Sequence, residues 1–152
     1  MNAADTRALL SAIERKVRLL EAALTTASGM LAALDRDEEP APEMLATAFE
    51  DRQNIFTELQ SVDAFLIPYR REWSEIAQEV APDARAEIER LGARARRAAR
   101  DLLVADQRIL RCLVPARQRL TDVLGGIQRG QEAIRGYRPF RAGAAVRVHR
   151  DV

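Results

Sequence analysis

The chain has 152 residues, of which 47% are hydrophobic, 31% charged and only 5% aromatic. This length suits one ordinary domain, and the dominance of Ala, Leu, Arg and Glu over Gly and Pro favours long helices over sheets. The formal net charge is only +1, which argues against general nucleic-acid binding, and the longest uncharged apolar run is too short to cross a bilayer.

The first predicted helix begins near Asp5 and Thr6, which are suitable N-cap residues. The acidic stretch 35–39 and Pro40 end it, because proline disfavours helix in the residue before it. We expect a loop there. Between these limits apolar residues recur in alternating steps of three and four, which is the spacing of a coiled-coil seam: Leu10, Ile13, Val17, Leu20, Leu24, Ala27, Leu31 and Leu34.

A second predicted helix begins at Pro42, whose missing N–H suits the first helical turn. Pro68 lies inside this helix, and the seam keeps its phase across it, so we expect a kink and no chain reversal. Phe49 and Phe56 widen the apolar stripe on one flank, and Pro82 ends the helix. The seam residues are Leu45, Ala48, Arg52, Ile55, Leu59, Val62, Leu66, Tyr69, Trp73, Ile76 and Val80.

The third predicted helix is the longest, and its seam slips by one extra step of four beside Pro115, where we expect a kink. At 1.5 Å per residue, a helix over residues 83–137 is about 80 Å long and the first helix only about 45 Å. The third helix must therefore overhang its neighbours, bend back at Gly125-Gly126, or pair with another molecule. Its seam comprises Ile88, Leu91, Ala95, Ala98, Leu102, Ala105, Ile109, Cys112 and Ala116, then Leu120, Val123, Ile127, Gly130, Ile134 and Tyr137.

These patterns predict an all-α fold, a long antiparallel bundle or coiled coil of three helices with the third long and kinked near Pro115. Residues 1–137 are expected to form a single helical-bundle domain. Residues 138–152 contain Pro139, Gly143 and four arginines but no seam, so we expect a flexible basic tail there.

The third helix has an unusually wide apolar face. Alanine occupies many seam positions between residues 95 and 116, so this part either packs very closely in a bundle core or forms a shallow groove for a partner helix. Two shorter helices can hardly cover the whole of such a face. This favours the interpretation that part of it is a groove for a partner helix. A second stripe beside the seam widens the face: Leu103, Leu110, Leu113, Leu120 and Leu124.

Residues that could support catalysis are sparse. The one histidine, His149, lies in the predicted tail, and Cys112 occupies a core position, where an inert buried thiol is expected. No Gly-Lys-Ser/Thr follows the glycines of the third helix, so they do not form a phosphate-binding loop. We therefore expect no catalytic, metal or cofactor site, and no enzyme. A single cysteine and no signal peptide favour the cytoplasm.

Charge is distributed unevenly along the chain. Residues 1–75 carry 8 basic and 14 acidic side chains, a net charge of −6, whereas residues 76–152 carry 16 and 9, a net charge of +7. The two halves should attract each other when folded side by side. A cluster of arginines raises the alternative of a nucleic-acid binder, although acidic neighbours dilute it and no aromatic residues interleave with it: Arg90, Arg94, Arg96, Arg97 and Arg100.

Two stretches carry a family resemblance. Residues 127–137, with the sequence IQRGQEAIRGY, resemble the C-terminal signature of flagellar type III export chaperones of the FliT and FlgN type. Residues 52–59, RQNIFTEL, look like the second-helix pattern of those proteins. The resemblance in helical architecture extends over residues 5–137, whereas the resemblance in amino-acid sequence is limited to these two stretches.

The resemblance implies a small cytoplasmic helical chaperone that holds the amphipathic end of a flagellar hook-junction or filament-cap subunit. It implies that Tyr137 docks on the export gate. We expect no membrane insertion, and a homodimer or a self-assembling coiled-coil scaffold stays as an alternative. The residues expected to bind the protein partner are Leu103, Leu110, Leu113, Leu120, Leu124, Ile127, Ile134 and Tyr137.

Overall fold

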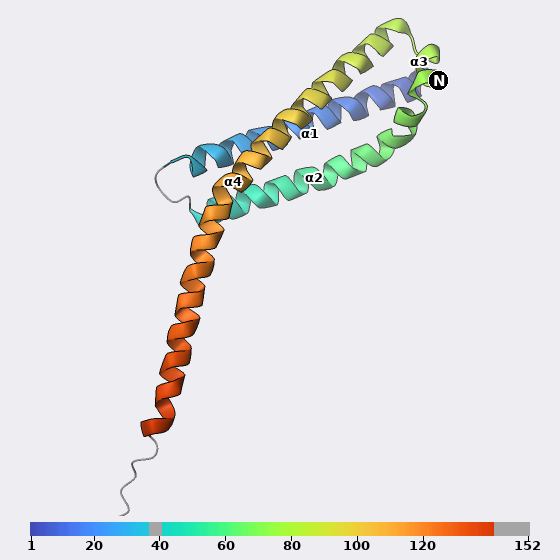
Figure 1. Cartoon of the computed structure of the whole chain (residues 1–152). Coiled ribbons are helices and arrows are strands. Elements are labelled where there is room, and N and C mark those ends of the chain that lie inside the picture. Colours follow the sequence, from blue (N-terminus) through green and yellow to red (C-terminus); the bar gives the residue numbers. More distant parts are fainter. Residues whose placement is uncertain (37–40, 142–152) are drawn as a thin grey trace, which may run out of the picture. The chain divides into compact units, whose positions relative to one another are not determined.

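The computed structural model describes residues 1–36 and 41–141, which are almost entirely helical and contain no strand. In chain order the helices are α1 (Ala3–Leu34), α2 (Pro42–Arg71), α3 (Trp73–Glu79) and α4 (Pro82–Arg141) (Figure 1). The prediction of an all-α fold is confirmed for this part of the chain.

The start of α1 differs from the sequence prediction. Asn2 is the N-cap, and its side-chain oxygen accepts a hydrogen bond from the backbone N–H of Asp5 at 2.8 Å. The predicted caps Asp5 and Thr6 therefore lie inside the helix, where the negative charge of Asp5 still suits the first turn. The proline at the start of α2 is the first helical residue, as expected.

The second predicted helix is in fact two helices. α2 continues through Pro68 to Arg71, and α3 begins only at Trp73. The residue between them, Glu72, caps α2 by donating its backbone N–H to the carbonyl of Pro68 at 3.2 Å. The interruption thus lies one turn after the proline, and the kink at Pro68 itself stays a prediction.

α4 extends without interruption from Pro82 to Arg141, including Gly125 and Gly126, so the chain does not bend back at these glycines. Residues on both sides of Pro115 are helical, and the kink there stays a prediction. Residues 138–141, predicted as tail, belong to α4, and the rest of that predicted tail, 142–152, lies outside the described residues.

The chain divides into two units, residues 1–111 and residues 112–152, whereas the sequence predicts one domain through residue 137. The first unit contains α1, α2, α3 and the N-terminal half of α4. The described part of the second unit is a single helical stretch, the C-terminal half of α4.

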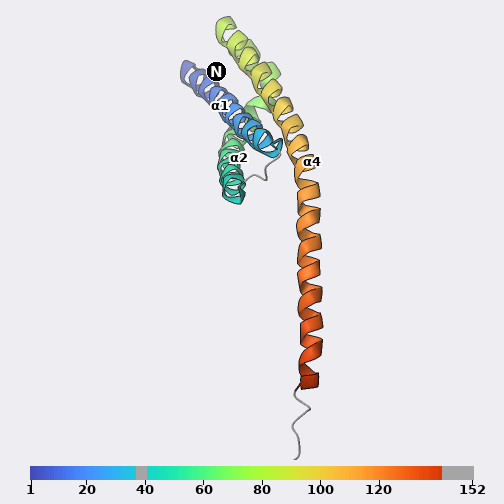
Figure 2. The ribbon, with the colours of Figure 1, turned by 90° about the vertical axis from the view of Figure 1, so that its left-hand side faces the viewer.

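The three long helices of the first unit lie side by side, and α2 runs opposite to the other two (Figures 1 and 2). Ion pairs between α1 and α4 join Glu21 to Arg94 at 2.6 Å and Asp35 to Arg108 at 3.9 Å. The sequence separation is the same in both pairs, as required for two parallel helices in constant register. Acidic residues of the first half of the chain thus meet arginines of the second half, as the charge distribution suggests.

The predicted seams supply most of the core of the first unit. Leu24 and Leu34 of the α1 seam are only half-buried, however, and Ala23, Met30 and Ala33 outside that seam are buried. In α1 the seam starts one residue earlier than predicted, with Leu9 buried and Leu10 only half-buried. In α4 every predicted seam residue up to residue 109 is buried: Ile88, Leu91, Ala95, Ala98, Leu102, Ala105 and Ile109.

By length and composition alone, α1 is apolar enough to cross a membrane, and it is the one described helix that passes this test. A core helix passes the same test. Leu9, Val17 and Met30 of α1 are the most completely buried large side chains of the described residues. Packing against the other helices thus accounts for part of the apolar character of α1, since 33% of its most apolar stretch is buried.

Candidate functional site: a trough between α2 and α4

A buried ion pair joins the middle of α2 to α4. Nη2 of Arg52 donates to Oδ1 of Asp106 at 2.5 Å, and the guanidinium carbon lies 5.4 Å from the ring centroid of Phe56. Arg52 is the one buried charged residue among those the structure describes, while the Asp106 side chain remains a third exposed. Because a buried charge needs its partner, this pair fixes the register between the two antiparallel helices.

The register brings two apolar pairs to the flanks of the ion pair. With residue 52 beside residue 106 in antiparallel helices, residue 49 falls beside residue 109 and residue 56 beside residue 102, so Phe49 and Phe56 lie within one residue of the levels of Leu110 and Leu103. Phe49, Leu103 and Leu110 are exposed, and Phe56 is half-buried. Exposed large apolar side chains that gather in one place typically mark an interaction site. We call these four residues the apolar patch.

The exposure of the patch contrasts with its immediate neighbours in α4. Leu102 is 5% exposed and Leu103 is 60% exposed, and Ile109 is 4% exposed and Leu110 is 61% exposed. The first residue of each pair therefore faces the core and the second faces solvent. α4 is apolar on two faces, and the other helices of the first unit cover only one of them.

A hollow of about 640 Å³ lies further along the same two helices, toward α3. Residues of α1, α2 and α4 line it together with Trp73 of α3. Tyr69 and Trp73 line one wall, and the small residues Gly92 and Ala99 line the other. The lining is mainly apolar, and its volume is within the range of known ligand-binding cavities, roughly 300–1,000 Å³.

The hollow and the patch lie on the same flank of α4. Gly92, Arg96, Ala99, Leu103 and Leu110 follow one another in helical steps of three, four or seven, so their side chains project from one side. From residue 92 to residue 110 this flank is about 27 Å long at 1.5 Å per residue. We call the hollow and the apolar patch together the trough.

The rim of the hollow carries positive charge. Arg70 of α2 and Arg96 of α4 are exposed, line the hollow, and form no ion pair with any described residue. Lys16 of α1 also lines it, but its ammonium group is paired with Asp63. Glu89 is the one acidic lining residue. The hollow end of the trough therefore favours an anionic group.

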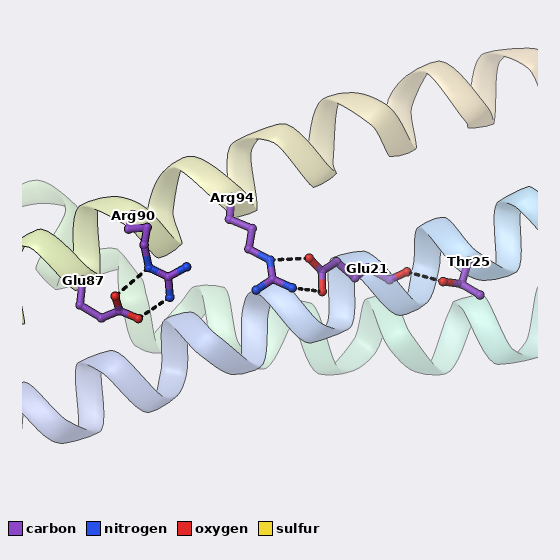
Figure 3. A network of polar contacts seen from close by, with 5 residues as sticks. All are labelled: Glu21, Thr25, Glu87, Arg90 and Arg94. Carbon is purple, nitrogen blue, oxygen red and sulfur yellow. Dashed lines mark hydrogen bonds and ion pairs between the residues drawn. The ribbon is translucent and has the colours of Figure 1, made fainter.

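Two of the clustered arginines serve the fold (Figure 3). Arg94 donates through Nε and Nη2 to both carboxylate oxygens of Glu21, at 2.6 and 2.8 Å, and so joins α4 to α1. Arg90 binds Glu87 of its own helix in the same two-pronged way, at 2.7 and 2.5 Å. The hydrogen bond from Arg90 lowers the pKa of Glu87 below its ordinary value. Both arginines are thus engaged by carboxylates, which weakens the nucleic-acid alternative.

The predicted partner-binding residues fall into both units. Leu103 and Leu110 belong to the first unit and are exposed; Leu124 and Ile127 belong to the second and are 53% and 52% exposed. Leu113 is half-buried. The side chains of the other predicted residues, Leu120, Ile134 and Tyr137, lie outside what the structure describes.

The sequence prediction of the site missed the contribution of α2. Phe49 and Phe56 signal it, because they extend the apolar stripe of that helix beyond its seam. Tyr69 and Trp73 are predicted as seam residues, and both are half-buried in the wall of the hollow. No sequence pattern indicated the hollow itself, which depends on the separation of two helices.

Residues 1–36 and 41–141 contain no group of three or more His, Cys, Asp or Glu residues that could hold a metal ion. Cys112 is half-buried in a helix, and His149 lies outside the described residues.

The fold and the trough together define a helical-bundle protein with an open, mainly apolar surface. Searches against protein-family models, curated proteins and solved structures gave no match.

Proposed function

We propose that this protein is a cytoplasmic export chaperone that holds the amphipathic end of a flagellar axial subunit and delivers it to the export gate. The observation that carries the proposal is the exposed apolar patch of α2 and α4, in which Leu103 and Leu110 face solvent beside buried neighbours. The assignment of a flagellar client comes from the sequence of residues 127–137, which resembles the C-terminal signature of flagellar export chaperones.

The dimensions of the trough support binding of a helical segment. A length of about 27 Å equals five turns of helix at 5.4 Å per turn. An amphipathic helix places apolar anchors at steps of three and four, which match the spacing along this flank of α4. A disordered segment that folds on binding loses conformational entropy, so its affinity stays modest and release for export is easy.

In this proposal the three long helices act as an antiparallel three-helix bundle that gives the trough a rigid base. The C-terminal half of α4 supplies a second apolar surface through Leu124 and Ile127, which are exposed. Leu113, Leu120 and Ile134 extend this surface in the sequence pattern. Tyr137 has the gate-docking role that the resemblance implies.

Recovery of bound proteins from the lysate of a flagellated host tests the proposal. The unmodified chain should retain a hook-junction or filament-cap subunit, and the double variant L103E/L110E should lose it while circular dichroism shows unchanged helicity. The matched control is Arg18→Glu, which changes an exposed charge on α1, away from the trough. Failure of the unmodified chain to retain any axial subunit overturns the flagellar assignment.

A structural scaffold is the second candidate function, and one observation favours it. The described part of the second unit is one helix with exposed Leu124 and Ile127, which is a suitable surface for self-assembly. Light scattering over a range of concentrations distinguishes the two. A constant small mass supports the chaperone, and open-ended growth supports the scaffold.

A further inference from the structure

We infer that the hollow end of the trough preferentially binds the acidic end of an amphipathic helix. One large apolar side chain of that helix enters between Trp73 and Gly92, and carboxylates next to it pair with Arg70 and Arg96. The inference rests on the proposed function only for its premise that the trough holds a helical protein segment.

The α4 wall of the hollow is built of small residues with one flexible arginine above them. A Cβ atom on Gly92 would be in ordinary van der Waals contact with Nη1 of Arg96 at 3.5 Å, so the guanidinium of Arg96 rests against the glycine and must swing aside for an entering side chain. Ala99 continues the wall one helical step further. Small residues allow close approach of a partner helix. The guanidinium of Arg96 above them can then contact polar groups beside the side chain that enters the hollow.

The two free arginines face the hollow from opposite walls. Arg70 extends from α2 and Arg96 from α4, so a carboxylate on either edge of a bound helix finds a cation. Toward the other end of the trough, the guanidinium of Arg52 is already paired with Asp106. The trough is therefore basic at one end and apolar at the other, which orients the bound segment.

The length of the exposed apolar flank favours a helix over a single acyl chain as the occupant. A fatty acid seated in the hollow would satisfy Arg70 or Arg96, but it would leave Leu103 and Leu110 exposed at the other end. A helix of about five turns covers the hollow and the patch together. The observations therefore favour an acidic amphipathic helix.

Three synthetic helical peptides test the inference. They share one apolar face, with anchors in steps of three and four, and carry Glu, Gln or Lys at the two positions beside the terminal anchor. Trp73 is the only tryptophan of the chain and lines the hollow, so its fluorescence reports entry of the anchor. Anisotropy of a dye on each peptide gives the dissociation constant.

We expect the Glu peptide to bind about tenfold more tightly than the Lys peptide at low salt, and the difference to shrink as salt screens the charges. The variant R70E/R96E should reverse this order and leave helicity unchanged. The control R18E should keep the original order. The Trp73 signal should change with the Glu peptide at the concentration at which anisotropy rises.

Equal binding of the three peptides overturns the inference but leaves the proposed function intact, because the trough still holds a helix. Oleate that displaces the Glu peptide at a lower concentration than unlabelled peptide does would make an acyl chain the occupant and overturn it too. If the protein dimerises with increasing concentration and the dimer binds none of the peptides, the trough is the binding site of a second copy. That result would also overturn the inference. The proposed function fails separately, when no axial subunit is recovered from lysate.

Discussion

Two adjacent leucines of α4 provide the most direct check of the trough. Leu102 is 5% exposed and Leu103 is 60% exposed, and each can be changed to alanine. Alanine is the best helix former, so both variants receive the same small gain in helix propensity. Any difference in their stability therefore reports the surroundings of the side chain.

The expected magnitudes follow from burial. Leu102→Ala removes a buried side chain and leaves a cavity, which costs about 2–5 kcal/mol. Full burial of a leucine contributes about 1.5–3 kcal/mol, and Leu103 is less than half buried, so Leu103→Ala should cost about 1 kcal/mol or less. The gap of about 2 kcal/mol or more corresponds to a difference in melting temperature of at least roughly 4–8 °C at this chain length.

Urea unfolding followed by circular dichroism at 222 nm measures the free energy of unfolding of each variant. Fluorescence anisotropy measures the affinity of each variant for the peptide. Leu103→Ala should weaken binding in spite of its small effect on the free energy of unfolding. Similar losses of stability in the two variants would refute the reasoning, because Leu103 would then belong to the core. A stable Leu103→Ala variant with unchanged binding would remove Leu103 from the site.

Three further predictions concern single contacts. Arg52→Leu leaves Asp106 without its partner and should cost about 1–3 kcal/mol in urea unfolding, less than for a fully buried pair because Asp106 is a third exposed; the double variant R52L/D106L should recover most of it. Tyr137→Ala should keep helicity and client binding but reduce export in a secretion assay, and loss of helicity would make Tyr137 a structural residue. Arg90→Gln should raise the pKa of Glu87 toward 4.5 in an NMR titration. Since the folded pKa of Glu87 is lowered, its pairing stabilises the fold above the ordinary carboxyl pKa and is lost as pH falls through the lowered value; an unchanged pKa in the variant would contradict this account.

The seam of α4 could be predicted because its apolar spacing leaves one way to bury the helix. Steps of three and four keep residues such as Leu91 and Ile109 on one side, and both are buried. The end of α2 could not be predicted in the same way. Proline removes one hydrogen bond but does not dictate where the next helix starts, and here α2 ends at Arg71.

The register between α2 and α4 was not evident from the sequence, because a heptad pattern allows the same apolar match after a slip of seven residues. Arg52, a charged residue at a seam position, resolves the choice by pairing with Asp106. Only that register places Phe49 near the level of Leu110. The sequence thus indicates which apolar side chains exceed the number that the core can bury. The ion pair determines which of these side chains on α2 and α4 lie near one another.

The glycines of the C-terminal half of α4 have a mechanical consequence. A Cβ atom on Gly125, Gly126 or Gly130 would meet nothing within 4 Å, so close packing does not require any of the three. Each lowers helix stability by about 0.8–1.0 kcal/mol relative to alanine, or about 3 kcal/mol together. This stretch of α4 is therefore a weaker helix than an alanine-containing stretch of the same length, and contacts made through the exposed Leu124 and Ile127 would stiffen it.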